Sequence, residues 1–416
     1  MSHAGQASKN IEVVSPESVG LSSERLARIE AHLDRRYIAP QKIAGALTLV
    51  ARKGEVAYLG TQGHMDLERN KPMAEDTIFR IYSMTKPITS VGLMMLYEHG
   101  HFQLDDPVYK FIPEWRDLRV YQTGNHPNWT TTPCQRPMTI RDLFTHMSGL
   151  TYDFMHRTNL DRAYRRLNVG RDRQKDLRAM VETLAGLPLE FSPGTAWNYS
   201  VSTDVLGYLI ELISGTPLDE YFRREIFEPL GMIDTGFVVP EDKIDRFAAN
   251  YTRGRDKKPY LEDDPETSVY ARPTSYFSGG GGLVSTAADY LQFCRMLLNR
   301  GELNGHRLLG RKTLELMTSN HLPEGQDLTD LAVGAFSETT YEGVGFGLGF
   351  SVQLDLAKSQ IVGSPGEFAW GGAASTAFWV DPAEDLITIF MTQLMPSGTF
   401  NFRGQLKSII YPAIID

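Results

Sequence analysis

The sequence predicts an α/β protein with an antiparallel sheet built from the two ends of the chain and a mostly helical region inserted between them. A predicted hairpin lies near the N-terminus, in residues 43–60. Strand-like segments with alternating apolar residues lie near the C-terminus, in residues 345–393. The long middle part of the chain holds helical patterns and few strand signals. A chain of 416 residues is long enough for two domains.

The N-terminal part begins with a predicted helix and hairpin. Apolar residues recur at helical spacing after a pair of serines, which predicts a helix over residues 23–38. Residues 43–52 and 55–60 flank a Lys-Gly turn and are apolar and partly β-branched, which predicts the hairpin. A further helix is expected to begin at Ser83, after a short apolar segment, and to end near Gly100.

The middle and C-terminal parts follow in the same way. Helical patterns separated by Pro/Gly-rich turns cover residues 139–146, 176–185, 201–214 and 217–228. A run of four glycines, 279–282, marks a change, and a helix over residues 286–300 follows it. Strand-like segments then cover residues 345–353, 366–371, 374–381 and 385–393, and a last helix is expected over residues 400–413.

These elements predict two domains. Residues 1–85 and 275–416 would form a discontinuous α/β domain with a central antiparallel sheet, and residues 86–274 would form the mostly helical domain. A cleft between two domains is a usual place for a ligand pocket. We therefore expect the active site there.

Composition excludes several classes of function. The chain is 42% hydrophobic and 22% charged with a net charge of −9, so it is a poor candidate for binding nucleic acid. The first ten residues are polar, and no run of 18 apolar residues occurs, so we expect no signal peptide, no membrane span and a cytoplasmic protein. Cys134 and Cys294 are widely separated, which argues for two free thiols rather than a zinc site. No metal and no cofactor is expected, and the oligomeric state stays open.

The most informative short motif is Ser83-Met84-Thr85-Lys86. Residues three apart on a helix share a face, so a hydroxyl and an amine placed in this way can share a proton. A serine becomes a nucleophile when a neighbouring base takes its proton. A chain of this composition contains about one such pair by chance, so the alternative is a helix cap followed by a solvated lysine. Pro87 indicates an irregular first turn.

Two later segments offer the groups that such a serine needs. Tyr199 lies on a loop before a predicted helix, and its phenol could act as a general base or acid. The alternative is a tyrosine that packs in the core. Gly371 and Gly372, which follow Trp370 in a predicted strand, suggest close approach of another backbone or of a ligand. The alternative is a bulge or a tight hairpin.

Together these motifs resemble those of a known family. The order Ser83-x-x-Lys86, Tyr199-Ser200 and Trp370-Gly371-Gly372 is similar to that of the family VIII carboxylesterases, which belong to the serine β-lactamase and penicillin-binding-protein superfamily and resemble class C β-lactamases. Three further segments also look familial: 143–150, 277–283 and 285–290. The resemblance runs from about residue 15 to the C-terminus and implies a β-lactamase/transpeptidase-like fold.

The resemblance also implies roles for individual residues. Ser83 would be the nucleophile and form an acyl-enzyme, and Lys86 and Tyr199 would share the activating proton, without either being identified as the base. The backbone N–H groups of Ser83 and Ala373 would form the oxyanion hole. The substrate-binding residues would be Trp370, Gly371, Gly372, Tyr152 and Phe154, although the last two could equally belong to the core.

Two departures from the β-lactamase pattern bear on the substrate. That family has an asparagine where this chain has Val201, which cannot bind a substrate amide, and a lysine where this chain has Trp370, which brings an apolar wall and no cation. The pocket is therefore expected to prefer neutral esters over anionic β-lactams. A small-molecule ester is the expected partner.

Several alternatives remain. A β-lactamase or D-amino peptide hydrolase would use the same residues, and so would an acyltransferase, a possibility raised by the similarity to fungal statin acyltransferases. An inactive relative that serves in binding or assembly is the non-enzymatic alternative. The Gly-x-Ser-x-Gly pattern does not occur, which argues against a Ser-His-Asp triad. His146 is therefore expected to have a structural role near the Ser148-Gly149 turn.

Overall fold

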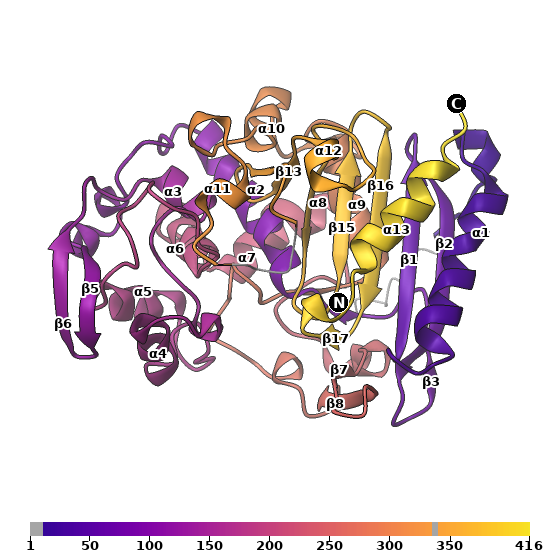
Figure 1. Ribbon diagram of the computed structural model, residues 1–416, viewed down its shortest axis with the longest axis horizontal. Helices are drawn as coiled ribbons and strands as arrows, with labels where there is room; N and C mark the ends of the chain where they lie inside the picture. The colour runs from indigo at the N-terminus through magenta and orange to yellow at the C-terminus, as the bar shows by residue number, and fades with distance from the viewer. Residues whose placement is uncertain (1–10, 335–339) are drawn as a thin grey trace, which may run out of the picture.

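The sheet at the centre of the molecule joins the two ends of the chain. A computed structural model describes residues 11–334 and 340–416, and within these ranges the main sheet has eight strands in the order β12-β13-β14-β15-β16-β1-β2-β3. Its strands are β12 Val344–Phe346, β13 Ser351–Gln353, β14 Phe368–Gly371, β15 Ala377–Asp381, β16 Leu386–Thr392, β1 Gly45–Arg52, β2 Glu55–Asp66 and β3 Lys71–Pro72. All neighbouring strands are antiparallel, and the ends of the chain meet where β1 pairs with β16 from Ala46↔Thr392 to Arg52↔Leu386 (Figure 1). The predicted antiparallel sheet is thus confirmed, except that the segment predicted as one strand, 345–353, forms two strands, β12 and β13, which pair with each other across a turn.

Two helices cover one face of this sheet. They are α1 (Ser23–Leu33), which continues into a π-helical turn (Asp34–Ile38), and α13 (Phe402–Ile410) (Figure 1). The apolar residues that predicted the first helix are buried in one cluster with Trp379 and Phe390 of the sheet. Full burial of one such side chain contributes about 1.5–3 kcal/mol, so this layer is held mainly by hydrophobic contact.

The opposite face of the sheet packs against α9 (Ala287–Leu298). Helix α9 and helix α2 (Thr85–Glu98) belong to the core that joins this face to the helical region. Tyr290 of α9 meets Phe378 of β15 with ring centroids 5.1 Å apart. Helix α2 is buried on nearly all sides, and its buried residues include the polar Thr89 and Ser90 as well as apolar side chains. It contacts α6 (Ser202–Ser214) and the helix after it, and the Tyr221 hydroxyl donates to the Gly92 carbonyl (3.0 Å).

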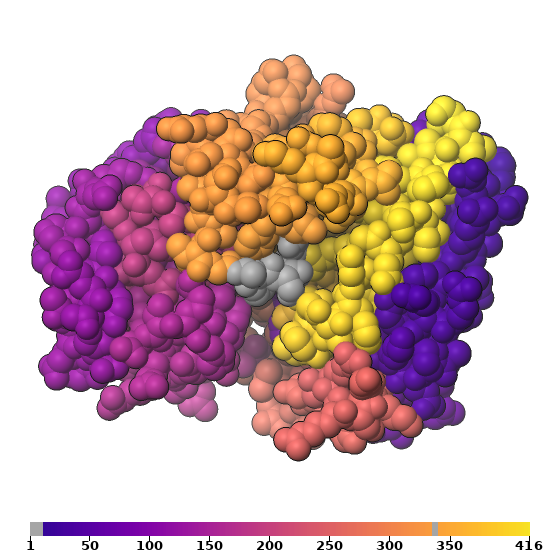
Figure 2. Space-filling model, in the orientation of Figure 1, coloured from indigo at the N-terminus to yellow at the C-terminus, as the bar shows by residue number. Residues whose placement is uncertain are grey.

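The middle of the chain is mostly helical, as predicted. Its α-helices are α3 Ile140–Phe144, α4 Asn159–Arg166, α5 Leu177–Ala185, α6, α7 Leu218–Phe222 and α8 Glu228–Leu230. Three further helices, α10 Arg311–Met317, α11 Leu328–Leu331 and α12 Leu356–Ser359, belong to the orange segment that lies across the top of the molecule between the helical region and the sheet (Figure 2). Within the two described ranges, no helix is long and apolar enough to cross a membrane.

Two strand pairs in the middle of the chain were not predicted. A hairpin joins β5 (Arg119–Asn125) to β6 (Asn128–Pro133), and β7 (Asn250–Arg253) pairs with β8 (Pro259–Asp263) and with β17 (Leu394–Met395). The first hairpin is exposed or half-buried throughout, so its sequence lacks the apolar alternation that marks a strand. The remaining short strands are β4 Phe79–Arg80 with β9 Val284–Ser285, and β10 Glu302–Leu303 with β11 His306–Arg307.

Candidate active site

Ser83 lies in an irregular turn between a short strand and a helix. β4 ends at Arg80, a 3-10 turn covers Tyr82–Met84, and α2 begins at Thr85, two residues later than predicted. Tyr82 has a positive φ of 41°, which is unusual for a non-glycine residue. The first hydrogen bond of the turn runs from the Met84 amide to the Ile81 carbonyl (3.0 Å). The Ser83 amide precedes this bond and lies where helix N–H groups have no partner within the helix.

Lys86 is buried beside Ser83. Its Nζ lies 3.4 Å from the Ser83 Oγ and donates to the carbonyl of Gly280 at 2.6 Å. The exposed fractions of Ser83 and Lys86 are 8% and 2%. The alternative of a solvated lysine is therefore wrong. The ammonium also lies 4.5 Å from the ring centroid of Tyr199 and 5.2 Å from that of Tyr152, so aromatic faces surround it.

Tyr199 is held in an aromatic cluster and is 1% exposed. Its ring centroid lies 4.9 Å from that of His146, 5.2 Å from that of Tyr152 and 5.6 Å from that of Trp370. Backbone hydrogen bonds fix the loop that carries Tyr199: the Asn198 amide donates to the His146 carbonyl (2.9 Å), and the amide two residues beyond Tyr199 donates to the Thr151 carbonyl (3.3 Å). The structure thus brings the Tyr199 ring to the Ser83–Lys86 pair.

The glycine run positions the carbonyl that binds Lys86. A Cβ on Gly279 would lie 2.8 Å from the Thr203 carbonyl oxygen, and a Cβ on Gly280 would lie 2.4 Å from the Asp204 carboxylate. A larger residue at either position would force neighbouring atoms of α6 to move. The buried Asp204 accepts hydrogen bonds from the Gly280 amide (3.1 Å) and the Ser278 hydroxyl (2.5 Å). Asp204 cannot be recognised from the sequence, because no local pattern distinguishes it from an ordinary helix residue.

The turn between β14 and β15 lies against the Ser83 turn. A Cβ on Gly372 would lie 2.4 Å from the Ile81 carbonyl oxygen, so glycine permits the two backbones to touch. The turn is also tight, with the Gly372 amide donating to the Thr376 carbonyl (2.8 Å). Both interpretations of the glycine pair therefore hold. Ala373 follows Gly372 directly, and its amide has no backbone acceptor among the residues described.

The other predicted substrate-binding residues differ in exposure. Trp370 is 1% exposed and packs between Tyr199 and Phe346, with ring centroids 5.6 and 5.3 Å away. Tyr152 and Phe154 stack with centroids 4.6 Å apart, and Phe154 is 42% exposed. Phe154 is therefore not a core residue, whereas Trp370 is buried and packs against the Tyr199 ring.

His146 takes part in a chain of hydroxyl groups. Its Nδ1 lies 3.2 Å from the Ser200 Oγ, which is 2.8 Å from that of Ser202, which in turn is 2.7 Å from that of Ser148. Burial, together with the charge of Lys86, holds the pKa of His146 well below its usual value, so the ring is neutral. These contacts agree with a structural role.

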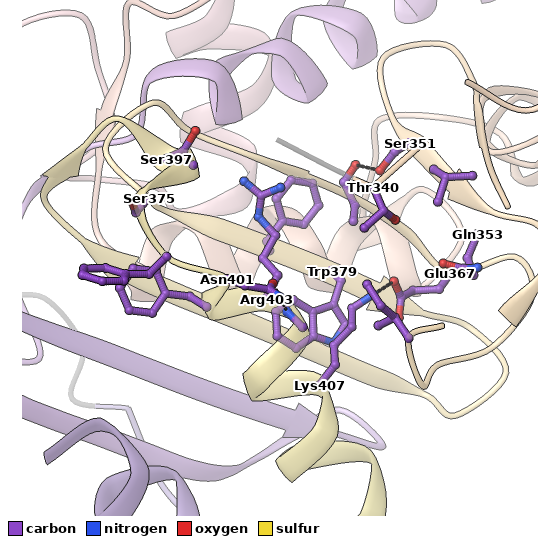
Figure 3. A pocket seen from close by; sticks show the side chains of 18 residues that line it. Thr340, Ser351, Gln353, Glu367, Ser375, Trp379, Ser397, Asn401, Arg403 and Lys407 are labelled. Atoms are coloured by element: carbon purple, nitrogen blue, oxygen red, sulfur yellow. Dashed lines mark hydrogen bonds and ion pairs between the residues drawn. The ribbon is translucent and has the colours of Figure 1, made fainter. Parts of the chain in front are cut away.

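A cavity of about 270 Å³ lies elsewhere, between α13 and the β13–β15 part of the sheet (Figure 3). Trp379, Arg403 and Lys407 are among its lining residues, and Ser83, Lys86 and Tyr199 are not. Lys407 forms an ion pair with Glu367 in its wall, which Figure 3 marks. The volume of this cavity therefore gives no information about the chemistry at Ser83.

Comparison with known proteins places the chain in a family. The family model named Beta-lactamase matches residues 27–407. The chain belongs to the beta-lactamase family. Esterase EstB of Burkholderia gladioli is 32% identical over 407 residues, which cover 92% of this chain and 94% of EstB. Protein Rv1367c of Mycobacterium tuberculosis is 37% identical over 357 residues, or 85% and 86% of the two chains.

A solved structure agrees. The structure described as EstCE1, a hydrolase with promiscuous acyltransferase activity, superimposes with a TM-score of 0.78 at 27% identity and covers 93% of this chain and 99% of its own. The resemblance to family VIII carboxylesterases and the expected β-lactamase/transpeptidase-like fold are thereby confirmed. The protein is an enzyme of the serine hydrolase kind.

Proposed function

We propose that the protein hydrolyses small carboxylic esters through an acyl-enzyme on Ser83. The observation that carries this proposal is the placement of the buried Lys86 amine, 3.4 Å from the Ser83 hydroxyl and 4.5 Å from the Tyr199 ring. The relationship to an esterase, EstB, supports the same substrate class.

In the first half-reaction the Ser83 Oγ attacks the ester carbonyl and gives its proton to the coupled Lys86–Tyr199 pair. The tetrahedral intermediate collapses, the ester C–O bond breaks, and the pair returns that proton to the leaving alcohol. The 3.4 Å separation is long for a hydrogen bond and would shorten in the substrate complex. The Gly280 carbonyl accepts a hydrogen from the amine in either protonation state and so holds Lys86 in place.

In the second half-reaction a water molecule attacks the acyl-enzyme, gives one proton to the same pair, and the proton returns to the Ser83 Oγ as the acid leaves. The amides of Ser83 and Ala373 would stabilise the oxyanion in both steps. Such donors are worth about 3–4 kcal/mol each. The close approach of Gly372 to Ile81 supports this pairing, because it brings the two turns together.

The side chains near Tyr199 favour a substrate that is uncharged beside its ester carbonyl, and they disfavour a β-lactam. Trp370 and Val201 are buried and apolar, so they offer neither a cation nor an amide to the groups beside the reacting carbonyl. A β-lactam places a carboxylate close to the reacting amide, and no charge from these two residues would balance it.

The test uses two chromogenic substrates, p-nitrophenyl butyrate and nitrocefin, with the wild type and a Ser83→Ala variant. We expect ester cleavage that exceeds nitrocefin turnover and falls to background in the variant. Nitrocefin turnover faster than ester turnover would contradict this proposal and indicate a β-lactamase. Ester cleavage that survives in the Ser83→Ala variant would show that another residue is the nucleophile.

Acyl transfer is a second candidate, favoured by the similarity to EstCE1 and by the common acyl-enzyme. An added alcohol would then compete with water for the same intermediate. Product analysis after incubation with vinyl butyrate and a primary alcohol would measure the ratio of transfer to hydrolysis. Only the acid product would appear if the protein is a strict hydrolase.

A further inference from the structure

Arg173 is a half-buried arginine in the loop between α4 and α5. Its carbonyl accepts hydrogen bonds from the Thr274 hydroxyl (3.2 Å) and the Ser275 amide (3.3 Å), which fasten the loop to the segment before the glycine run. Its guanidinium carbon lies 5.0 Å from the ring centroid of Tyr270. The Nη2 atom is buried and has no hydrogen-bond partner among the described residues.

Tyr270 connects Arg173 to the proposed catalytic residues. Its ring meets the ring of Tyr82 edge to face, with centroids 6.1 Å apart, and Tyr82 immediately precedes Ser83. Its hydroxyl donates to the Gly281 carbonyl (3.3 Å), one residue beyond the carbonyl that binds Lys86. Arg173 is therefore separated from the Ser83 turn by two aromatic rings, Tyr270 and Tyr82.

Two carboxylates of this region are already paired with other cations. Asp172, the residue before Arg173, pairs with Lys175, and Asp263, whose charge acts on Tyr270, pairs with Arg80. Within the described ranges Arg173 itself forms no ion pair. A buried guanidinium nitrogen without an acceptor loses hydration and gains no compensating hydrogen bond. We therefore expect a bound substrate to supply the acceptor. The planar guanidinium matches a carboxylate.

We propose that Arg173 binds a carboxylate carried by the substrate, at a distance from the ester bond set by the Tyr82 and Tyr270 rings. The preferred substrates are then esters with a remote anionic end. This inference rests on the proposed function and narrows its substrate class. It does not conflict with the apolar character of Trp370 and Val201, because those residues lie beside Tyr199, whereas Arg173 lies beyond Tyr270.

The kinetic test compares matched ester pairs. On the acyl side the pair is mono-p-nitrophenyl adipate and its methyl ester. On the alcohol side it is 4-carboxyphenyl butanoate and 4-(methoxycarbonyl)phenyl butanoate. The acid and the methyl ester of each pair differ in intrinsic reactivity. For each variant we therefore divide kcat/KM for the anionic ester by kcat/KM for its neutral partner, and we compare this ratio between variants. The pair that responds identifies which end of the ester faces Arg173.

Three variants give the contrast. Arg173→Met keeps length and removes charge, Arg173→Lys keeps charge, and Arg178→Met changes an exposed arginine of α5 that pairs with Glu182. We expect Arg173→Met to raise KM about tenfold for one anionic ester and to leave its neutral partner within about twofold. Arg173→Lys should restore part of the loss, and Arg178→Met should change neither. Equal effects on both members of each pair would overturn the inference.

A binding measurement separates this inference from the proposed function. The mono-anilide of adipic acid carries the same carboxylate and an amide in place of the ester. Calorimetric titration into a Ser83→Ala variant should show binding that the added Arg173→Met change weakens about tenfold. If no ester is cleaved but this contrast appears, the proposed function fails and the Arg173 site stands. 4-Butanamidobenzoic acid carries the carboxylate on the alcohol side and is the second ligand. Binding of both ligands that is indifferent to Arg173 would refute the site even in an active esterase.

Discussion

Two buried lysines lie on the two sides of one sheet, and their surroundings differ. Lys86 faces the Ser83 hydroxyl, the Gly280 carbonyl and the rings of Tyr152 and Tyr199. Lys407 of α13 forms an ion pair with the buried Glu367. Its ammonium also lies 5.5 Å from the centroid of the Trp379 ring.

The groups around each lysine determine which of the two can move a proton. A carboxylate partner stabilises the ammonium form and opposes its deprotonation. Neutral acceptors bind an amine in both protonation states, so a proton can leave with little rearrangement. Lys86 has the surroundings of a proton carrier, whereas Lys407 holds α13 against the sheet.

The largest contrast is expected from replacing each lysine by methionine. Lys86→Met should lower kcat for an ester by at least about 10³-fold with little loss of stability, because the side chain is near to apolar rings. Lys407→Met should leave kcat of the folded protein unchanged and destabilise it by about 3–5 kcal/mol, since Glu367 loses its partner. Kinetics and urea unfolding of both variants check this. A reversed pattern would refute the comparison.

A smaller effect is expected at the Lys86 side from Tyr199→Phe. The ring and its packing remain and only the hydroxyl is lost, so kcat should fall by about 10²-fold while the melting temperature changes little. Tyr164→Phe, in a buried tyrosine of α4 outside the site, is the matched control and should retain full activity. Unchanged kcat in Tyr199→Phe would leave Lys86 as the only proton carrier.

Substitutions at two adjacent glycines test the role of the carbonyl that binds Lys86. An added Cβ at position 280 would meet Asp204 at 2.4 Å, whereas one at position 281 would have its nearest neighbour 3.7 Å away. Gly280→Ala should therefore displace the carbonyl and lower kcat about tenfold, and Gly281→Ala should have little effect. Steady-state kinetics with one ester compares them. Equal activity in the two variants would show that the carbonyl is not needed.

The smallest effect concerns pH at the Lys407 side. Burial raises the pKa of Glu367 above its ordinary value of 4.5, against the opposing charge of Lys407. The folded state therefore holds this proton at pH values where the unfolded state has released it. The stability gained is complete below pH 4.5 and is lost as pH rises through the folded pKa. Urea unfolding between pH 4 and 8 should show a flatter profile for Glu367→Gln; an identical slope would contradict this.

Much of the fold could be predicted because it follows from periodicity. The long helices and the strands of the sheet carry regular apolar spacing, and residues 23–38 and 385–393 are examples. The hairpin of β5 and β6 could not be found, because its side chains face solvent or lie half-buried. The motif residues Ser83, Lys86 and Tyr199 could be named from the sequence, whereas Asp204 and the proposed contact of Arg173 could not, since both depend on partners distant in sequence.

The contact between Gly372 and Ile81 has a consequence for how the protein becomes active. The two halves of the expected oxyanion hole come from opposite ends of the chain, and they meet only when β14 and β15 have joined the sheet. Contacts between such distant residues form late and slowly in folding. Activity is therefore a late event: a chain still emerging from the ribosome, or cut before its last strands, holds the nucleophile but lacks the second half of its oxyanion hole.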